Sequence, residues 1–379
     1  MSSSSSSSAS LKPPSRSSSC LRLSYTLILP ILAAAALYRL DSFDPSPLPY
    51  HQIPHPFLTA PAQNGQLLRG AERIGFPDLQ APEDLVYDEE TRFIYTGCAD
   101  GWVKRVSVAE EAAVVEKVAF TGGRPLGLAK GLYGNWIVAD VAKGLLNVTK
   151  DGNVELLATE AEGLPFALTD AVDVAKDGLI YFTDASHKYT FKNYLLDILE
   201  GKPHGRFLSY NPFTRSTQVL ATDLYFANGV VVSPDQSHAI FCETVMQRCM
   251  KYHLRGSKRG TVEKFIEGLP GGPDNIHYNA DGHYTIGLST GASFIWNTLV
   301  KYPSVRKITA MYHKAVGLAD IGREGGVMIV DKEGRPVAHY HDVKLSMSSS
   351  AISVGDNLYI GSVMYPYILR LNTTKYPAI

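Results

Sequence analysis

Six copies of one short pattern follow each other after residue 80, and they constrain the fold more than any other feature. In each copy a polar residue leads into an apolar strand, a tight turn follows, and a second strand of the Tyr-Ile-x-x-Asp kind comes next. The paired segments are 83–87 with 92–101, 124–131 with 135–140, 169–178 with 179–186, 227–236 with 238–244, 273–282 with 283–290, and 348–356 with 357–363. Most copies begin about 40 to 60 residues apart, the spacing of propeller blades made of four short antiparallel strands. The pattern predicts an all-β protein, a six-bladed β-propeller.

The residues between the paired strands support this fold and exclude others. Asp-Gly and Gly-Asn steps supply the positive φ values that tight hairpins need. No segment has the pattern of a doubly wound sheet, and the glycine-rich phosphate loops of nucleotide enzymes are absent. Lysine plus arginine (36) nearly equals aspartate plus glutamate (37), which argues against a nucleic-acid partner. We expect a small-molecule substrate instead. The sequence contains no signal for oligomerisation.

Two inserts interrupt the repeat, at about residues 187–205 and 292–318. Both have apolar residues at roughly helical spacing. One interpretation is a helical lid beside the mouth of the channel, because propellers place specificity in the loops at the channel end. The other is a helix that covers a blade edge or the flank of the propeller.

The N-terminus has the layout of a targeting signal. Residues 1–22 form a serine-rich tail, predicted to be disordered and cytosolic, and the apolar segment 23–40 follows its positive charges. This order favours translocation of the rest of the chain into the secretory pathway lumen. Since the apolar run is short for a membrane span, it is either an uncleaved signal anchor, which would hold the protein on the membrane, or a cleaved signal peptide. The endoplasmic reticulum, the vacuole and the cell surface all stay open as destinations.

Three further features bear on the compartment and the domain boundary. The segment 41–65 is rich in proline and predicts an extended linker, which leaves 66–379 for the propeller. Asn147 and Asn372 begin glycosylation sequons. Cys242 and Cys249 flank a turn-length stretch and form either a disulfide across a hairpin or a pair of small core residues.

The residues that open the repeats are the candidate metal ligands. In a propeller the innermost strand of each blade begins at the central channel, so these side chains point to a common axis. They are Glu83, Thr169 with Asp170, Asn228, and Asp274 with Asn275, and the remaining two positions hold Leu126 and Ser349. Carboxylate and amide oxygens suit a hard cation, Ca²⁺ rather than zinc. Asn and Asp before a strand also cap turns, but recurrence at one register in four repeats favours a calcium site.

The chain resembles a known family through four of these motifs. PEDLVYD, ANGVVVSPD, GPDNIHYNADG and NLYIGSVMYPYILRL are similar to the strictosidine synthase-like branch, which includes the adipocyte plasma membrane-associated proteins, of the calcium-dependent phosphotriesterase and paraoxonase superfamily. The resemblance covers residues 65–379 and the N-terminal anchor. It implies a six-bladed propeller and a catalytic calcium held through Glu83, Asn228 and Asp274, often with Asn275 and a residue at Thr169–Asp170. It also implies that Asp274 or Glu83 doubles as nucleophile or base.

Two positions depart from the family pattern. Strictosidine synthase uses a glutamate ahead of the last Tyr-Ile-Gly as the base that condenses tryptamine with secologanin, and Ser349 stands at that position here. Serine has no group with a usable pKa for that role. Leu126 stands where paraoxonases place the histidine of lactone hydrolysis. Both departures argue against direct transfer of the family's best-known reactions to this chain.

Three functions remain for comparison. The leading hypothesis is a Ca²⁺-dependent, arylesterase-like hydrolase of small esters or lactones. The first alternative is a strictosidine synthase-type condensing enzyme of alkaloid biosynthesis, which Ser349 disfavours. The second is a non-catalytic lumenal propeller that binds a partner, since fold does not settle function. His277 is expected on the face turned away from the metal position, as a packing residue, and His187, His204 and His283 receive no role.

Overall fold

The computed structural model describes residues 17–108, 113–317 and 322–379 of a chain that divides into two units, Met1–Asp44 and Pro45–Ile379. The first unit contains α1 (Ser17–Leu40), which includes the predicted apolar segment. Residues 17–22 are therefore helical and not disordered as predicted, because the leucines of the apolar segment are good helix formers and the helix extends back from them. The rest of the predicted tail, 1–16, lies outside the described residues. Among the helices of the described ranges, none is long and apolar enough to cross a membrane.

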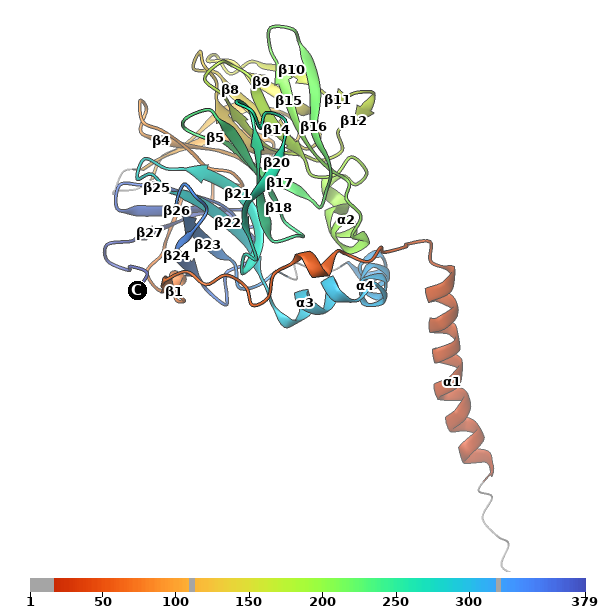
Figure 1. Cartoon of the computed structure of the whole chain (residues 1–379). Helices are drawn as coiled ribbons and strands as arrows, with labels where there is room; N and C mark the ends of the chain where they lie inside the picture. Colours follow the sequence, from red (N-terminus) through yellow and green to blue (C-terminus); the bar gives the residue numbers. More distant parts are fainter. Residues whose placement is uncertain (1–16, 109–112, 318–321) are drawn as a thin grey trace, which may run out of the picture. The chain divides into compact units, whose positions relative to one another are not determined.

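The described part of the second unit forms a six-bladed β-propeller, as the repeat predicted (Figure 1). Blades 1 to 3 are β3 (Val86–Asp88), β4 (Phe93–Gly97), β5 (Trp102–Ser107) and β6 (Val115–Phe120); β7 (Pro125–Lys130), β8 (Trp136–Asp140), β9 (Gly144–Val148) and β10 (Val154–Ala158); β13 (Thr169–Val174), β14 (Ile180–Asp184), β15 (Gly205–Asn211) and β16 (Ser216–Leu224). Blades 4 to 6 are β17 (Ala227–Val232), β18 (His238–Glu243), β19 (Arg248–His253) and β20 (Val262–Glu267); β21 (Gly271–Tyr278), β22 (Tyr284–Gly291), β23 (Gly326–Val330) and β24 (Pro336–His341); β25 (Ser348–Val354), β26 (Asn357–Ser362), β27 (Ile368–Asn372) and β2 (Glu72–Ile74). A small hairpin, β11 (Glu160–Ala161) with β12 (Leu164–Pro165), joins blades 2 and 3.

Strands from both ends of the second unit close the ring. β2 pairs antiparallel with β27 and is the outer strand of blade 6, and β1 (Ala62–Asn64) pairs in parallel with β24 of blade 5. Leu48 and Ile53, near η1 (Tyr50–Gln52), are buried in the core. The predicted linker 41–65 is therefore corrected: its apolar residues pack on the propeller, and the folded unit begins near Pro45 instead of Gln66.

The acidic residue that ends the second strand of the repeat has a structural role in three blades. Its buried carboxylate accepts a hydrogen bond from a backbone N–H of the loop that leads into the innermost strand. The distances are 3.1 Å from Arg124 N to Asp140, 3.0 Å from Leu168 N to Asp184, and 2.9 Å from Tyr225 N to Glu243. Because a buried carboxylate needs such donors, the Tyr-Ile-x-x-Asp pattern fixes the point at which each of these innermost strands begins.

A β-bulge lies at the same place in the innermost strands of blades 2 to 6. At this place two residues of the innermost strand lie opposite a single residue of the second strand. The two residues are 126–127, 170–171, 228–229, 274–275 and 349–350 in blades 2 to 6. A bulge bends the strand and re-aims a side chain. The first residue of each bulge is one of the predicted channel residues, Leu126, Asp170, Asn228, Asp274 and Ser349.

Glycine follows the channel residue where neighbouring innermost strands approach most closely. A Cβ on Gly229 would overlap the backbone of Asp274 and Asn275 in the next blade, and a Cβ on Gly127 would overlap the backbone at Asp170. The missing side chain lets the backbones meet. This close approach brings the bulges of adjacent blades together around the axis.

Both predicted inserts are helical and lie at the bulge end of the blades. η3 (Phe191–Asn193) and α2 (Tyr194–Glu200) connect β14 to β15, and α3 (Phe294–Lys301) and α4 (Pro303–Val316) connect β22 to β23. Since the second strand of a blade ends beside the start of the first, these connections leave the sheet at the bulge end. The buried guanidinium of Arg306 in α4 donates to the carbonyl of Leu199 in α2 and so ties the two inserts together. One further short helix, η2 (Leu67–Arg69), precedes β2.

The predicted covalent features lie on strands. Cys242 of β18 and Cys249 of β19 are cross-strand partners, joined by a disulfide with a Cα–Cα distance of 3.9 Å. Both cysteines are also buried, so the pair is at once a disulfide across a hairpin and a pair of small core residues. Asn147 lies within β9, half-buried, with its amide bonded to Asn135 and Glu155, and Asn372 ends β27. Glycosylation at either asparagine stays a prediction.

Ring closure by β2 predicts a large effect of a small core change there. Ile74 of β2 is buried against Ile352, Tyr359 and Ile368. Ile74→Ala should lower the free energy of unfolding by about 2–5 kcal/mol, measured by urea denaturation. The same change at Ile308, which is 59% exposed, serves as the matched control and should stay within about 0.5 kcal/mol of the parent. Equal effects at the two positions would contradict the role given to β2.

Candidate metal centre and substrate pocket

Four of the predicted ligands meet at one cavity. Glu83, Asp170, Asn228 and Asp274 are buried, and all four line a cavity of about 270 Å³. The side chain of Asn275, also predicted, donates from Nδ2 to Oε1 of Glu83 at 2.6 Å, across 192 positions of sequence. The bulges and the closed ring thus bring together side chains from four blades.

Several buried oxygens at this point have no hydrogen-bond partner among the described residues. They are Oε2 of Glu83 and Oδ1 of Asn228, on residues that line the cavity, and Oγ1 of Thr169, the residue before Asp170. Most buried polar atoms in folded proteins are satisfied, and one that is not requires an explanation. Since the free oxygens of Glu83 and Asn228 can act as acceptors at the cavity and find no donor there, they fit a hard cation that prefers oxygen ligands.

Within the described residues no three side chains among His, Cys, Asp and Glu form a ready metal cluster. The candidate centre is of another kind, because an amide oxygen supplies part of its donor set. Its acidic members come from blades 1, 3 and 5, and Asn228 of blade 4 lies between the last two. Such a mixed set suits Ca²⁺, whose coordination is flexible in geometry and accepts amide oxygens.

Burial and mutual repulsion disfavour the charged forms of the carboxyl groups at this centre. Burial, and then the charge of Asp274, raise the pKa of Glu83 well above its ordinary value. Burial and then Asp184 raise the pKa of Asp170 to about 8. The pKa of Asp274 is likewise raised well above the ordinary value, first by burial and then by Asp170, although a hydrogen bond from Asn228 acts against this. Either a proton or a cation therefore stabilises these carboxylates.

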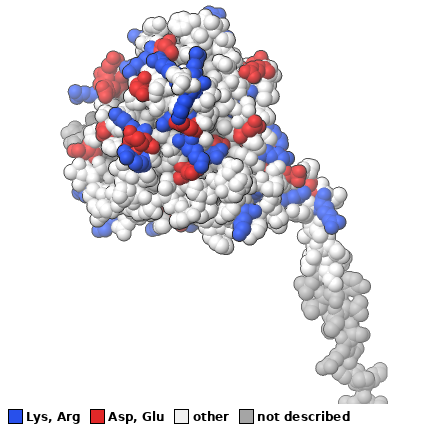
Figure 2. Space-filling model, viewed as in Figure 1, with Lys and Arg blue, Asp and Glu red and all other residues white. Residues whose placement is uncertain are grey.

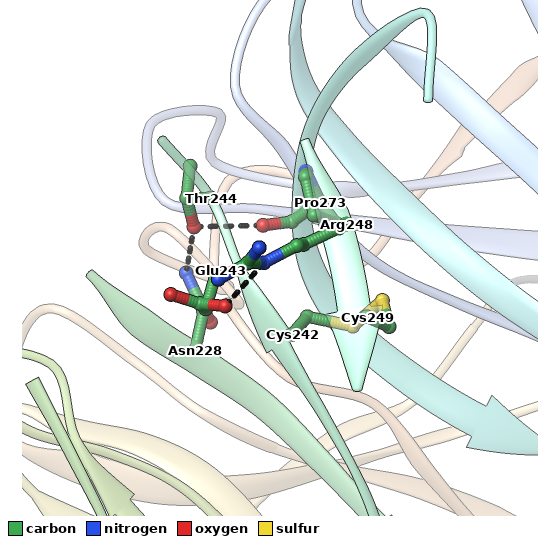
Figure 3. Close-up of a disulfide and its surroundings, with 7 residues drawn as sticks. All are labelled: Asn228, Cys242, Glu243, Thr244, Arg248, Cys249 and Pro273. Atoms are coloured by element: carbon green, nitrogen blue, oxygen red, sulfur yellow. Dashed lines mark hydrogen bonds and ion pairs between the residues drawn. A yellow bond between two sulfur atoms is a disulfide. The ribbon is translucent and has the colours of Figure 1, made fainter. Parts of the chain in front are cut away.

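Thr244 is a member of this site that the sequence did not indicate. Figure 3 shows it beyond the end of β18, where its hydroxyl accepts from Asn228 Nδ2 at 3.3 Å and donates to the Pro273 carbonyl at 2.7 Å. Thr244 therefore orients Asn228 and joins blades 4 and 5. The disulfide between Cys242 and Cys249 joins the two strands of the same hairpin. The only local signal was the position of Thr244 directly after the second strand of the repeat.

Leu126 and Ser349, which depart from the family pattern, lie at the predicted positions near the start of the innermost strands of blades 2 and 6. Leu126 lines the cavity and gives it an apolar side at blade 2. Ser349 is buried, and its hydroxyl donates to the backbone carbonyl of Glu83 at 2.6 Å. Ser349 thus links blade 6 to blade 1 and positions the loop that presents Glu83.

A second polar layer lies next to the candidate ligands along the innermost strands. Nε2 of His277 lies 2.6 Å from Oδ1 of Asp84 and 3.1 Å from the hydroxyl of Ser350. Burial alone would lower the pKa of His277, but the Asp84 carboxylate outweighs it and raises the pKa. His277 is therefore a satisfied histidine with an acidic partner. Asp84, which follows Glu83 directly, was not singled out from the sequence.

The wall of the cavity is mostly apolar and comes largely from the inserts. Phe191, Tyr194, Leu195 and Ile198 come from η3 and α2, and Ile295, Trp296 and Leu299 come from α3. The inserts therefore stand at the mouth of the channel, as the lid interpretation predicted. Helical spacing alone did not show which of their residues would face the cavity.

The histidines without a predicted role lie away from the ligand set. Nε2 of His204 lies 2.9 Å from Glu200 of α2, and its ring packs edge-on against His187 at 5.3 Å between centroids. His283 lies in the turn between β21 and β22. None of the three is among the described residues that line the cavity.

Two family models match the sequence. The strictosidine synthase model matches residues 170–257, and the strictosidine synthase-like N-terminal model matches residues 61–106. Protein STRICTOSIDINE SYNTHASE-LIKE 6 of Arabidopsis thaliana is 50% identical over 360 residues, which cover 94% of this chain and 96% of the relative. The human adipocyte plasma membrane-associated protein is 32% identical, with 93% of this chain and 89% of the relative covered.

Solved structures of the same fold include two bacterial proteins. A gluconolactonase from Xanthomonas campestris superimposes with a TM-score of 0.57 at 16% identity, covering 83% of this chain and 95% of its own. A calcium-binding protein, regucalcin, from Agrobacterium tumefaciens gives the same values. At this identity the likeness concerns the fold, and it confirms the predicted propeller.

The raised pKa values predict that the chelated protein becomes less stable as pH rises. An unfolded aspartate has a pKa near 3.9, whereas that of Asp170 is about 8 in the folded protein. Its stabilising contribution is therefore complete below about pH 4 and is lost as pH rises through about 8. Thermal unfolding in the presence of a chelator should show Tm falling over this range. Asp170→Asn should flatten the profile, and an unchanged profile in that variant would contradict the assignment.

Proposed function

Because the chain belongs to the strictosidine synthase-like family, we propose that it is a calcium-dependent hydrolase of small esters or lactones. One observation supports this most directly: three buried carboxyl groups and the unsatisfied oxygens of Glu83 and Asn228 meet at an open cavity. In a polar cluster with a purely structural role, the buried polar atoms would form hydrogen bonds with one another. This one offers acceptors to a cation and space to a substrate.

Glu83, Asn228 and Asp274 would hold the ion, with Asp170 and Thr169 beside them. When bound, calcium supplies the positive charge that polarises an ester or lactone carbonyl and stabilises the charge that develops on its oxygen. Thr244 keeps the Asn228 amide in place, and Ser349 fixes the loop that presents Glu83. By the family resemblance, Asp274 or Glu83 also serves as nucleophile or base toward the bound substrate.

The pocket walls select the substrate by shape and polarity. The aromatic rings of Phe191, Phe226 and Trp296 line the cavity together with its acidic residues. An apolar wall with few polar groups favours a substrate whose acyl or alcohol part is aliphatic or aromatic. The gluconolactonase and the calcium-binding regucalcin of the same fold support lactone hydrolysis and calcium as the starting hypotheses for this chain.

The alternatives are less well supported. A condensing enzyme of the strictosidine synthase type needs a base at position 349, and the hydroxyl of Ser349 is engaged with the Glu83 carbonyl. A non-catalytic binding propeller would not need unsatisfied carboxylate and amide oxygens beside a cavity. Secretory or membrane association, in keeping with the name of the adipocyte plasma membrane-associated relatives, is part of the proposal.

Hydrolysis should depend on calcium and on the ligand set. We expect the purified chain to bind calcium and to hydrolyse aryl esters or lactones, with activity lost on chelation and restored by calcium. Asp274→Asn should lower kcat/KM by at least about 100-fold, because it removes charge from the ion's site. Asp281→Asn, in the exposed turn of the same blade, is the matched control and should retain activity. A chain without bound calcium and without turnover would refute the hydrolase and favour the binding function.

The condensing alternative has its own test. Incubation of the chain with tryptamine and secologanin should give no condensation product by chromatography, because Ser349 cannot act as the base. Ser349→Glu tests the position directly, with folding checked by circular dichroism. Condensation by the unmodified chain would show that another residue supplies the base and would overturn the preference for hydrolysis.

A further inference from the structure

A second cavity lies between blades 3 and 4, at the end of the propeller opposite the candidate metal centre. Its volume is about 250 Å³, and its lining comes from β14 and from three turns, which join β13 to β14, β17 to β18 and β19 to β20. The inserts leave the blades at the bulge end, so these three turns lie at the other end. Among the described residues, none lines both this cavity and the central one.

Two arginines at this cavity have no acidic partner. Arg255 and Arg259 belong to the turn between β19 and β20, and within the described part of the chain neither guanidinium forms an ion pair or a hydrogen bond. Glu263 of the same hairpin pairs with Lys258 instead, at 2.9 Å. On the face shown in Figure 2, by contrast, Lys and Arg are interspersed with Asp and Glu. The two arginines are therefore available to an anion from outside the chain.

Tyr181 of β14 supplies a third donor. Its side chain lines the cavity, and the residue is only 6% exposed. Burial raises the pKa of Tyr181 to about 12, so its hydroxyl keeps its proton, and the charges of Arg255 and Arg259 reach the same hydroxyl. That hydroxyl has no hydrogen-bond partner in the described ranges, whereas the hydroxyl of a buried tyrosine usually finds one. The three donors thus surround one space and lack an acceptor.

The rest of the lining is mostly apolar. Ala175, Leu179 and Leu254 line the cavity and pack with the core between blades 3 and 4. Asp177 also lines the cavity, but its Oδ1 accepts from the N–H of Leu179 at 3.1 Å, and one aspartate against two arginines leaves the lining positive. Guanidinium groups bind carboxylates and phosphates through parallel N–H groups. An apolar wall beside such donors favours a small molecule over the polar surface of an acidic protein.

We propose that the cavity between blades 3 and 4 binds a small organic anion, in which a carboxylate or phosphate group is joined to an aliphatic or aromatic body. Arg255 and Arg259 hold the anionic group, and the hydroxyl of Tyr181 donates to it. The body of the ligand lies against Leu179 and Leu254. This site goes beyond the proposed hydrolysis and does not depend on it, because the two cavities have separate linings.

The test measures the binding of benzoate and of phenyl phosphate to the full chain by isothermal titration calorimetry. A chelator is present throughout, so that no cation in the central cavity attracts the anion. Inorganic phosphate, which lacks the apolar body, and phenol, which lacks the charge, are the comparison probes. Arg255→Gln combined with Arg259→Gln removes both charges, and Tyr181→Phe removes the hydroxyl but keeps the ring. Arg215→Gln, in the exposed turn between β15 and β16 at the same end of the propeller, is the matched control.

We expect benzoate or phenyl phosphate to bind more tightly than both comparison probes, and the tighter of the two identifies the anionic group. The double arginine variant should raise its Kd by at least about tenfold and Tyr181→Phe by about threefold, because both remove hydrogen bonds to a charged group. The control should leave the Kd unchanged. The proposal is overturned if neither probe binds, if inorganic phosphate binds as tightly, or if Arg215→Gln weakens binding as much as the double variant. Binding of polyglutamate without either small probe would assign the arginines to an acidic macromolecule instead.

Discussion

The repulsion among buried carboxyl groups at the centre of the ring is the constraint on which the rest of the site depends. Glu83, Asp170 and Asp274 line the same cavity from three blades, and burial raises the pKa of each. Left charged and unpaired, such groups oppose folding. A proton or a cation offsets this cost, and the fold holds the groups in place: strand bulges aim the side chains, and the glycines beside them let neighbouring strands approach.

The blade pattern could be predicted from the sequence because its signals are local. A hairpin requires its turn residues and its alternating strands within about a dozen positions, so each copy was visible separately. The positions of the candidate ligands followed from the same register, since the residue that opens a repeat lies at the start of an innermost strand. Asp170, Asn228 and Asp274 are found at those positions in the structure.

Other features depend on contacts between distant segments and left no local signal. A bulge arises from the way two strands pair, with two residues of one strand opposite one residue of the other. The sequence around Asn228 alone therefore does not indicate the bulge there. The segment 41–65 resembled a linker because its prolines block helix and sheet, yet Leu48 and Ile53 are buried against residues far along the chain. Thr244 likewise acquires its role only when the carbonyl of Pro273 comes within 2.7 Å.

The pairing of β2 with β27 has a consequence for biosynthesis. During translation β2 is made before the strands of blade 1, whereas its partner strand, β27, follows all the other blade strands of the described residues. β2 therefore stays without its partner until β27 has been made. A chain that stops before β27 would lack the pairing that holds β2 in blade 6, and its loss would thereby affect a centre whose candidate ligands all precede β27 in the sequence.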